Sequence, residues 1–292
     1  MPELPEVESV RRSLLPYLPG RVIEEAVVHH PKVLVFPSPS EFVADLKGAR
    51  FEELGRRGKL LIFQLPPYVL LIHLGMTGQV TFRDPGRADT PFERHSHTGL
   101  QRTLQHPPDQ HTHISLHFGD GCALLYRDIR KFGKWRLIHR DNPRLQAELA
   151  RVGTDPLTAD WKFGPFEKAV SSSQRAIKAI ILDQQVAAGV GNIYADEALF
   201  LAGIRPEVRG SQLSRKRLQK LFRAIPEVLH KGLEHGGTSF SDYVDADGKK
   251  GRNQEQLLVY GRYGQPCFTC GESLLRTTVA QRTSSWCKVC QK

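Results

Sequence analysis

The chain has 292 residues, of which 40% are hydrophobic and 25% are charged. These ordinary values exclude a wholly disordered protein. The sequence has no 18-residue apolar run, so no membrane span is predicted, and it has no secretory signal, so export is not predicted. Lys and Arg outnumber Asp and Glu by 41 to 31, a net charge of +10, which favours a polyanionic partner such as nucleic acid or an anionic membrane face.

The first predicted element is an amphipathic helix over residues 6–18. The apolar side chains that recur at helical spacing are Val7, Val10, Leu14 and Leu18. Pro16 should kink or end this helix, because proline lacks a backbone N–H.

Residues 51–138 show the pattern of short strands. The apolar or alternating runs are residues 60–65, 69–74, 114–118, 123–126 and 135–138. Gly, Pro and Asp separate these runs and no helical pattern intervenes, so a β-sandwich or barrel is predicted.

A polar insertion at residues 83–110 interrupts the strand region. It contains His95, His97 and His106, and further histidines follow it. Clustered histidines in a polar loop are typical of a solvated insertion, and a metal site is the alternative.

Residues 142–160 contain two prolines and a glycine and are interpreted as a linker. The helical patterns that follow are residues 166–171, 175–185, 193–202 and 214–234. Ser214 is a good N-cap for the last helix, and Pro226 should kink or split it. The first turns of that helix are strongly basic, which is usual for a solvated surface but here favours a face toward nucleic acid.

Four of the five cysteines lie near the C-terminus, as the pairs Cys267/Cys270 and Cys287/Cys290. Two CxxC turns at this spacing are typical of a four-cysteine zinc ribbon, because each turn supplies two thiolates to a tetrahedral site. Two disulfides are the alternative, which a chain without a secretory signal disfavours. We expect one structural zinc ion, and Cys122, in an apolar run, is expected to be a core thiol.

The first residues combine an amine and carboxylates. Met1 precedes the small residue Pro2, so its removal would leave a proline secondary amine, and α-amino groups have a pKa of about 7.7–8.0. A neutral secondary amine can attack a sugar C1′ or an aldehyde and form a cationic iminium. Glu3 and Glu6 are acid/base candidates beside it. The alternative is a plain extended start.

Lys59 follows Arg56 and Arg57 at the start of a predicted strand. Like charges lower the pKa of a lysine and favour its neutral form, which suits a proton carrier. A phosphate contact is the alternative use of the same side chain.

Two glycine-containing turns hold side chains that could contact DNA bases. Met76 lies between Gly75 and Gly78, where it can act as a wedge in a base stack or simply fill the core. Arg130 and Phe132 share another turn, where they can hydrogen-bond and stack with bases, although a core Phe is the alternative.

The glycine-rich turn at residues 189–191 runs into a predicted helix that begins near Asn192. Backbone N–H groups at such a helix start can bind one phosphate, and Asn192 can add a side-chain donor. An ordinary turn between helices is the alternative.

Taken together, these motifs resemble the formamidopyrimidine-DNA glycosylase (Fpg/Nei) family of DNA glycosylase/AP lyases. The matching segments, in the family's order, are Pro-Glu-Leu-Pro-Glu-Val-Glu at 2–8, Arg-Arg-Gly-Lys at 56–59, His-Leu-Gly-Met-Thr-Gly at 73–78, Arg-x-Phe-Gly at 130–133, Gly-Val-Gly-Asn-Ile-Tyr-Ala at 189–195, Val-Tyr-Gly-Arg at 259–262, Ala-Gln-Arg at 280–282 and the terminal cysteine pair. They span almost the whole chain, and Leu4 resembles the formamidopyrimidine branch.

The resemblance implies an α+β fold with four parts. These are an N-terminal catalytic β-sandwich with the first helix (1–141), a linker (142–160), a helix–two-turn–helix DNA-binding module with a lesion loop (161–251) and a zinc ribbon (252–292). The loop corresponds to residues 238–252, and DNA is expected between the domains.

The resemblance also implies roles for individual residues. Pro2 attacks C1′ of the damaged nucleotide, Glu3 donates a proton, Lys59 takes part in β-elimination, and Arg282 grips phosphates and supports δ-elimination. The implied DNA-binding residues are Met76, His111, Arg130, Phe132, Lys178 and Asn192.

The implied function is excision of oxidised purines, chiefly 8-oxoguanine and formamidopyrimidines, from double-stranded DNA by a monomer in the bacterial cytosol or nucleoid. The alternatives are an endonuclease VIII-like enzyme that prefers oxidised pyrimidines, and a non-catalytic DNA-binding protein, which retention of Met1 would favour. The chain departs from the family in its long insertion, in Ile129 where proline is common, and in Ser173 and Gln174 where basic residues are common.

Overall fold

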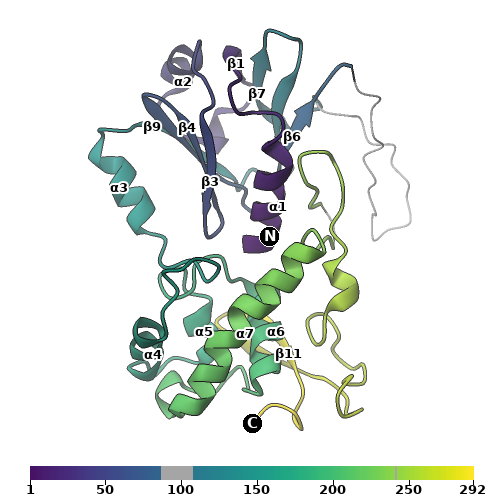
Figure 1. Cartoon of the computed structure of the whole chain (residues 1–292). Coiled ribbons are helices and arrows are strands. Elements are labelled where there is room, and N and C mark those ends of the chain that lie inside the picture. Colours follow the sequence, from purple (N-terminus) through teal and green to yellow (C-terminus); the bar gives the residue numbers. More distant parts are fainter. Residues whose placement is uncertain (87–107, 241) are drawn as a thin grey trace. The chain divides into compact units, whose positions relative to one another are not determined.

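The computed structural model describes residues 1–86, 108–240 and 242–292 (Figure 1). The chain divides into two compact units, of which the first comprises Met1–Ala150 and His235–Gln254 and the second comprises Arg151–Glu234 and Glu255–Lys292. Residues 235–254 therefore belong with the N-terminal unit, whereas the sequence places most of them with the helical module.

The N-terminal unit contains two β-sheets. The first is antiparallel, in the order β1-β7-β8-β6, and its strands are Ile23–Val28, Thr112–Phe118, Ala123–Asp128 and Gly78–Arg83. The second has the order β2-β9-β5-β4-β3, and its strands are Leu34–Phe36, Lys134–His139, Tyr68–His73, Leu60–Leu65 and Glu53–Arg57. Only β2 and β9 run parallel in this sheet.

Both sheets contribute to one hydrophobic core, which confirms the predicted sandwich. Tyr126 of the first sheet and Trp135 of the second are both buried, with ring centroids 5.2 Å apart. Side chains of Leu116 and Phe63 belong to the same cluster. The alternation of buried residues along the strands thus builds a core between two faces.

Helix α1 (Leu4–Leu14) lies against β3 and β4 and completes this core (Figure 1). It begins earlier than predicted, because the backbone N–H of Glu3 is satisfied by the side chain of Glu6. It ends before Pro16, as predicted. Two further helices of this unit are α2 (Pro39–Leu46) and α3 (Pro143–Ala150), and the 3₁₀ turn η1 is Pro31–Val33.

The second unit is helical and ends in a two-stranded hairpin. Its helices are α4 (Phe163–Ser171), α5 (Ile177–Ile181), α6 (Asn192–Ala202) and α7 (Arg215–Glu234), and its hairpin is β10 (Leu275–Val279) with β11 (Arg282–Trp286). The remaining 3₁₀ turns are η2 (Gly210–Gln212) and η3 (Asn253–Gln256).

Two helix predictions need correction. The helix expected over 175–185 is only the five-residue α5, because Asp183 begins a turn in which its carbonyl accepts the N–H groups of Val186 and Ala187. Pro226 does not split α7, since the buried face that includes Leu221 and Leu229 continues on both sides of it.

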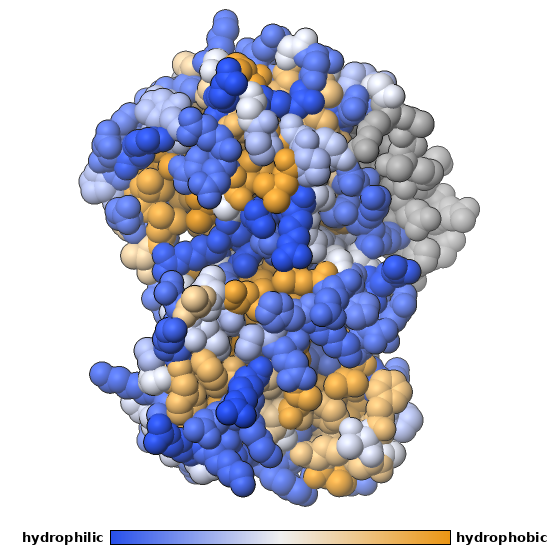
Figure 2. Space-filling model, viewed as in Figure 1, coloured by the Kyte–Doolittle hydropathy of each residue, from blue (hydrophilic) through white to orange (hydrophobic). Residues whose placement is uncertain are grey.

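The surface along α7 is largely hydrophilic (Figure 2), in keeping with exposed basic residues such as Lys216, Lys220 and Arg223. None of the helices within the described ranges is long and apolar enough to cross a membrane.

Candidate functional site

The N-terminal residues are packed into the first unit. Pro2 is buried, Glu3 is 3% exposed, and Met1 is 46% exposed. The backbone N–H of Glu3 donates to Glu6 Oε2 at 2.8 Å, which fixes the chain just before α1 begins. The predicted amine and its acid/base candidates therefore lie on one rigid helix start.

Lys59 lies in the turn between β3 and β4 and is 7% exposed. The Arg56 guanidinium donates to Glu8 Oε2 at 3.0 Å and to the carbonyl oxygen of Gly58 at 2.9 Å. A carboxylate of α1 therefore holds the turn that precedes Lys59. This pairing also weakens the expected repulsion between Arg56 and Lys59, because the Arg56 charge has a counter-ion.

Glu8 is the centre of a charge cluster between α1 and β3. It is 6% exposed and lies within 3.0 Å of nitrogens of three arginines, Arg11, Arg12 and Arg56. Burial raises the pKa of Glu8, but hydrogen bonds and charges of these arginines prevail and lower it to about 2. The carboxylate is thus ionised throughout the neutral range.

His73 is a residue that the sequence reasoning missed, although its motif was noted for Met76. It lies opposite Leu60 in the β4–β5 register. Burial, followed by the charges of Lys59 and Arg136, lowers the pKa of His73 to about 4. The N–H of Gly75 donates to His73 Nδ1 at 3.1 Å, so the neutral ring carries its proton on Nε2.

Two turns bring Met76, Arg130 and Phe132 together on the surface. Met76 is 40% exposed and Phe132 is 51% exposed. Arg130 Nη1 donates to Met76 Sδ at 3.2 Å, and its guanidinium carbon lies 4.7 Å from the Phe132 ring centroid. The alternative of a core Met and a core Phe is therefore excluded.

Asp128, which the sequence reasoning also missed, holds these turns. It is fully buried, and Oδ1 accepts from the Thr77 hydroxyl at 2.5 Å and the Arg130 N–H at 3.2 Å. Oδ2 accepts from the Gly133 N–H at 2.8 Å and the Tyr126 hydroxyl at 3.0 Å. The signal in the sequence was an acidic residue at the end of an apolar strand. A carboxylate that is buried there requires several hydrogen-bond donors, which indicates a structural role.

His111 precedes β7, and its backbone N–H donates to Asp109 Oδ1 at 2.9 Å. Asp109 also pairs with the buried Arg127 at 2.8 Å. His95, His97 and His106 lie outside the described residues, so the nature of the insertion stays a prediction.

In the second unit, helix α6 anchors the hairpin. Asn192 Nδ2 donates to the carbonyl oxygen of Thr283 at 3.0 Å, and Asp196 Oδ2 accepts from the N–H of Ser285 at 3.1 Å. Glu197 accepts the N–H groups of three successive residues, Leu258, Val259 and Tyr260, at 2.8 to 2.9 Å. The bonds of Asn192 and Asp196 fix β11, at whose start the exposed Arg282 stands, and those of Glu197 fix the segment before the hairpin.

Lys178 lies beneath this hairpin and is 0% exposed. Its ammonium lies 2.7 Å from Asp196 Oδ1, and it donates to the Thr283 carbonyl oxygen at 2.9 Å and to Ser284 Oγ at 2.6 Å. In this structure it is therefore not available to a DNA strand. The geometry makes it a positioning residue for the strand that carries Arg282.

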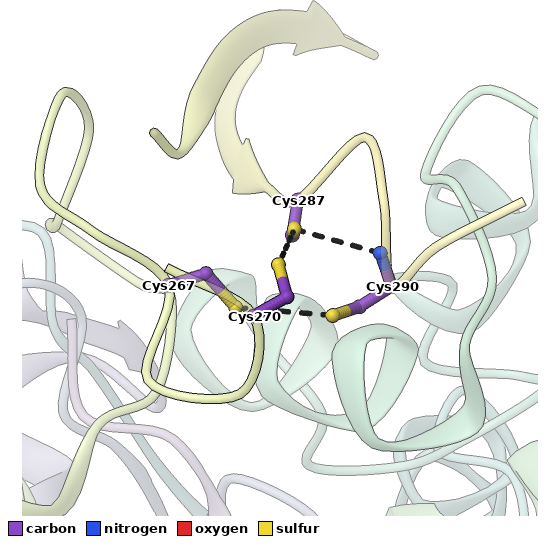
Figure 3. A group of neighbouring side chains, drawn as sticks. All are labelled: Cys267, Cys270, Cys287 and Cys290. Carbon is purple, nitrogen blue, oxygen red and sulfur yellow. Dashed lines mark hydrogen bonds between the residues drawn. The ribbon is translucent and has the colours of Figure 1, made fainter. Parts of the chain in front are cut away.

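The four C-terminal cysteines point toward one another from two turns (Figure 3). Their sulfur atoms lie within 4.8 Å of one another, with Cys267 and Cys290 sulfurs 3.9 Å apart and Cys270 and Cys287 sulfurs 3.4 Å apart. None of them is in a disulfide, and Cys122 is a buried thiol as predicted. The cluster has the composition of a metal site, since four cysteine sulfur atoms converge.

Comparisons with known proteins agree with this arrangement. A family model described as the formamidopyrimidine-DNA glycosylase N-terminal domain matches residues 1–135, and one described as its H2TH domain matches residues 152–244. The chain is 38% identical over 292 residues to a formamidopyrimidine-DNA glycosylase of Desulfitobacterium hafniense, and 41% identical over 294 residues to that of Heliobacterium modesticaldum, in each case covering 100% of both chains.

Two solved structures are similar over nearly the full length. The Fpg of Lactococcus lactis in complex with DNA containing an abasic site has a TM-score of 0.85 and 33% identity, covering 99% of both chains. The Fpg (MutM) protein of Thermus thermophilus has a TM-score of 0.83 and 37% identity, covering 99% of this chain and 98% of that one.

Proposed function

The chain belongs to the formamidopyrimidine-DNA glycosylase family, and we propose that it is a DNA glycosylase with AP lyase activity that excises oxidised purines, such as 8-oxoguanine and formamidopyrimidines, from duplex DNA. The observation that carries this proposal is similarity along the whole chain to proteins of that name. Solved complexes of the Lactococcus lactis relative contain abasic-site DNA and Fapy-dG DNA, which match the two steps of such a reaction.

Pro2 is the proposed nucleophile. Its nitrogen must first be released from Met1, because an amide nitrogen does not attack carbon. The free amine then bonds to C1′ while the glycosidic bond breaks and the base leaves with that electron pair, protonated by Glu3. The amine then loses its proton and the C1′–O4′ bond breaks, with a proton taken up by O4′, so the sugar ring opens and leaves an iminium. This iminium accepts the electron pair when a C2′ proton is removed, so the 3′ phosphate departs by β-elimination. A second elimination releases the 5′ phosphate.

Lys59 is proposed to serve in β-elimination as the proton-transfer group. It is 7% exposed, and Arg56 and Glu8 fix the turn that carries it. Arg282 is proposed to bind the phosphates beside the lesion and to support δ-elimination. Its place on a hairpin that α6 anchors supports that role.

The DNA-binding residues are proposed in two groups. Met76, Arg130 and Phe132 fill the space left by an everted base, whose removal from the stack costs a few kcal/mol. Their mutual contacts and exposure support this role. His111 is a proposed DNA contact, Asn192 is a proposed phosphate ligand, and Lys178 is proposed to act by positioning.

The cysteine cluster is proposed to hold one structural zinc ion. Cys267, Cys270, Cys287 and Cys290 supply four soft ligands, which is the donor set that closed zinc sites prefer. Bound zinc would fix the two turns that flank the hairpin and would take no part in the chemistry. We further propose a monomer with the four parts that the resemblance implies, except that residues 235–251 belong with the N-terminal unit. Because the relatives are bacterial, we propose that it is located beside the chromosome in the cytosol.

Borohydride trapping tests the mechanism. A duplex that contains 8-oxoguanine should yield a covalent adduct with the mature protein, and Pro2→Gly should lose most of the adduct and the strand cleavage. Pro39→Gly, at an exposed helix start, is the matched control and should behave like the wild type. Absence of an adduct, or equal cleavage by Pro2→Gly, would contradict the mechanism.

Oxidised pyrimidines are a second candidate substrate class. The observation that favours them is a solved complex of the Lactococcus lactis relative with DNA that contains an oxidised pyrimidine. Competing duplexes with thymine glycol and 8-oxoguanine measure the preference, and faster excision of thymine glycol would reverse the proposed ranking.

A further inference from the structure

One carboxylate of the N-terminal unit connects two segments that are distant in sequence. Glu6 is 1% exposed, and its Oε2 accepts the N–H of Glu3 at 2.8 Å. Its Oε1 accepts the N–H of Thr238 at 2.7 Å, from a segment 232 positions away. Both oxygens are thus used by backbone donors, which a buried carboxylate requires.

The backbone of the second segment is shaped for this contact. Gly236 and Gly237 both have positive φ angles, of 70° and 87°. A Cβ on Gly237 would lie 2.9 Å from Glu6 Cγ and 3.0 Å from Oε1, so a side chain there would displace the carboxylate. The Tyr243 hydroxyl lies 3.2 Å from the carbonyl oxygen of Glu6 and 3.1 Å from that of Gly236.

The far part of the same segment is held separately. The N–H of Ala246 donates to Ser13 Oγ at 2.9 Å, and the Tyr17 hydroxyl donates to Asp247 Oδ1 at 2.7 Å. Phe240 lies before these attachments and is 43% exposed. The near part, from Gly236 to Phe240, is held by Glu6 together with residues 252–254, since Asn253 Nδ2 donates to Thr238 Oγ1 at 2.8 Å.

We propose that Glu6 is a positioning residue that couples the catalytic N-terminus to the segment His235–Gln254. Its carboxylate sets the place of Thr238 and of the Glu3 backbone together, so a shift of one is transmitted to the other. The catalytic part of this inference rests on the function proposed above, whereas the structural part does not.

Hydrogen exchange followed by mass spectrometry tests the coupling in the full-length protein. In Glu6→Gln a single amide oxygen replaces two carboxylate oxygens, so the peptide spanning residues 236–240 should exchange about tenfold faster or more. Peptides from β4 and β5 should be unchanged. Glu41→Gln is the matched control, because Glu41 accepts its N-cap N–H in the same way, at 3.0 Å, on the exposed start of α2.

Tyr243→Phe is a second variant that keeps the ring and removes only the hydroxyl. It should raise the exchange rate of the same peptide by a smaller factor. If Glu6→Gln does not fold, Tyr243→Phe alone tests the coupling. An increase of less than about twofold in the peptide in either folded variant overturns the coupling.

Single-turnover excision of 8-oxoguanine then tests the catalytic part. Glu6→Gln should lower the rate constant about tenfold or more at saturating enzyme, with duplex affinity nearly unchanged. If Glu6→Gln speeds hydrogen exchange at residues 236–240 but leaves the excision rate constant unchanged, the proposed coupling to the catalytic N-terminus is overturned. If the wild-type protein excises no base, the proposed function fails, while the exchange experiment still measures the role of Glu6.

Discussion

Replacing Lys178 by methionine should destabilise the second unit strongly. The Lys178 ammonium is 0% exposed and lies 2.7 Å from the carboxylate of Asp196, which is 2% exposed. Removing one partner of a buried ion pair leaves an uncompensated charge and costs about 3–5 kcal/mol. The donors to the Thr283 carbonyl and the Ser284 hydroxyl are lost as well. We therefore expect Lys178→Met to lower the free energy of unfolding by that amount near pH 8.

The loss should depend on pH through Asp196. Burial raises the pKa of Asp196 to about 6, although Lys178 lowers it, so removing Lys178 should raise the pKa further. When the folded state raises the pKa of a carboxyl group, the folded protein loses stability as pH rises from the unfolded pKa to the folded pKa of that group. The difference between wild type and variant should thus widen above pH 6, by up to about 1.4 kcal/mol per pH unit.

Urea unfolding followed by tryptophan fluorescence at pH 6 and pH 8 measures this difference. The double variant Lys178→Met with Asp196→Asn removes the unpaired charge and should regain much of the stability, since the asparagine still accepts the N–H of Ser285. A double variant as unstable as the single one at pH 8, or a difference that does not grow with pH, would refute the reasoning about the buried charge.

Three further outcomes are expected. The pKa of His73 is lowered to about 4, so its contribution to folding stability is complete above pH 6.5 and is lost as pH falls toward 4, by up to about 3 kcal/mol. His73→Gln should flatten this pH dependence of the urea midpoint. Gly133→Ala should lower the melting temperature, because its Cβ would lie 1.6 Å from the Tyr126 hydroxyl, whereas Gly164→Ala, with no atom within 4 Å, should not; equal melting temperatures would count against the argument. Cys287→Ser should lose bound zinc in a colorimetric assay after unfolding, and retention of one equivalent would contradict the proposed site.

Features that depend on neighbours along the chain were predicted well. The cysteine pairs converge as expected, because each CxxC turn is local and only two turns must meet. Helix α1 follows its apolar stripe, and the alternating strands form a sandwich. Met76, Arg130 and Phe132 were predicted from two glycine turns, and the structure brings them together.

Lys178 shows the limit of this reasoning. The resemblance alone implied that Lys178 binds DNA, and burial of its ammonium is costly without partners. The partners are Asp196 on another helix and two residues of the hairpin about 105 positions away, which local patterns do not reveal. The same holds for Asp128, whose donors come from two turns that only the sheet brings together.

The sequence by itself determined which residues carry the proposed chemistry, because Pro2, Lys59, the Met76, Arg130 and Phe132 group and the four cysteines lie in short contiguous motifs. The tertiary structure decided which charges are paired and which segments are held. Glu8 neutralises Arg56, 48 positions away, and Glu6 holds Thr238, 232 positions away. Such pairings depend on the packing of the whole core, since no local preference specifies a partner so distant along the chain.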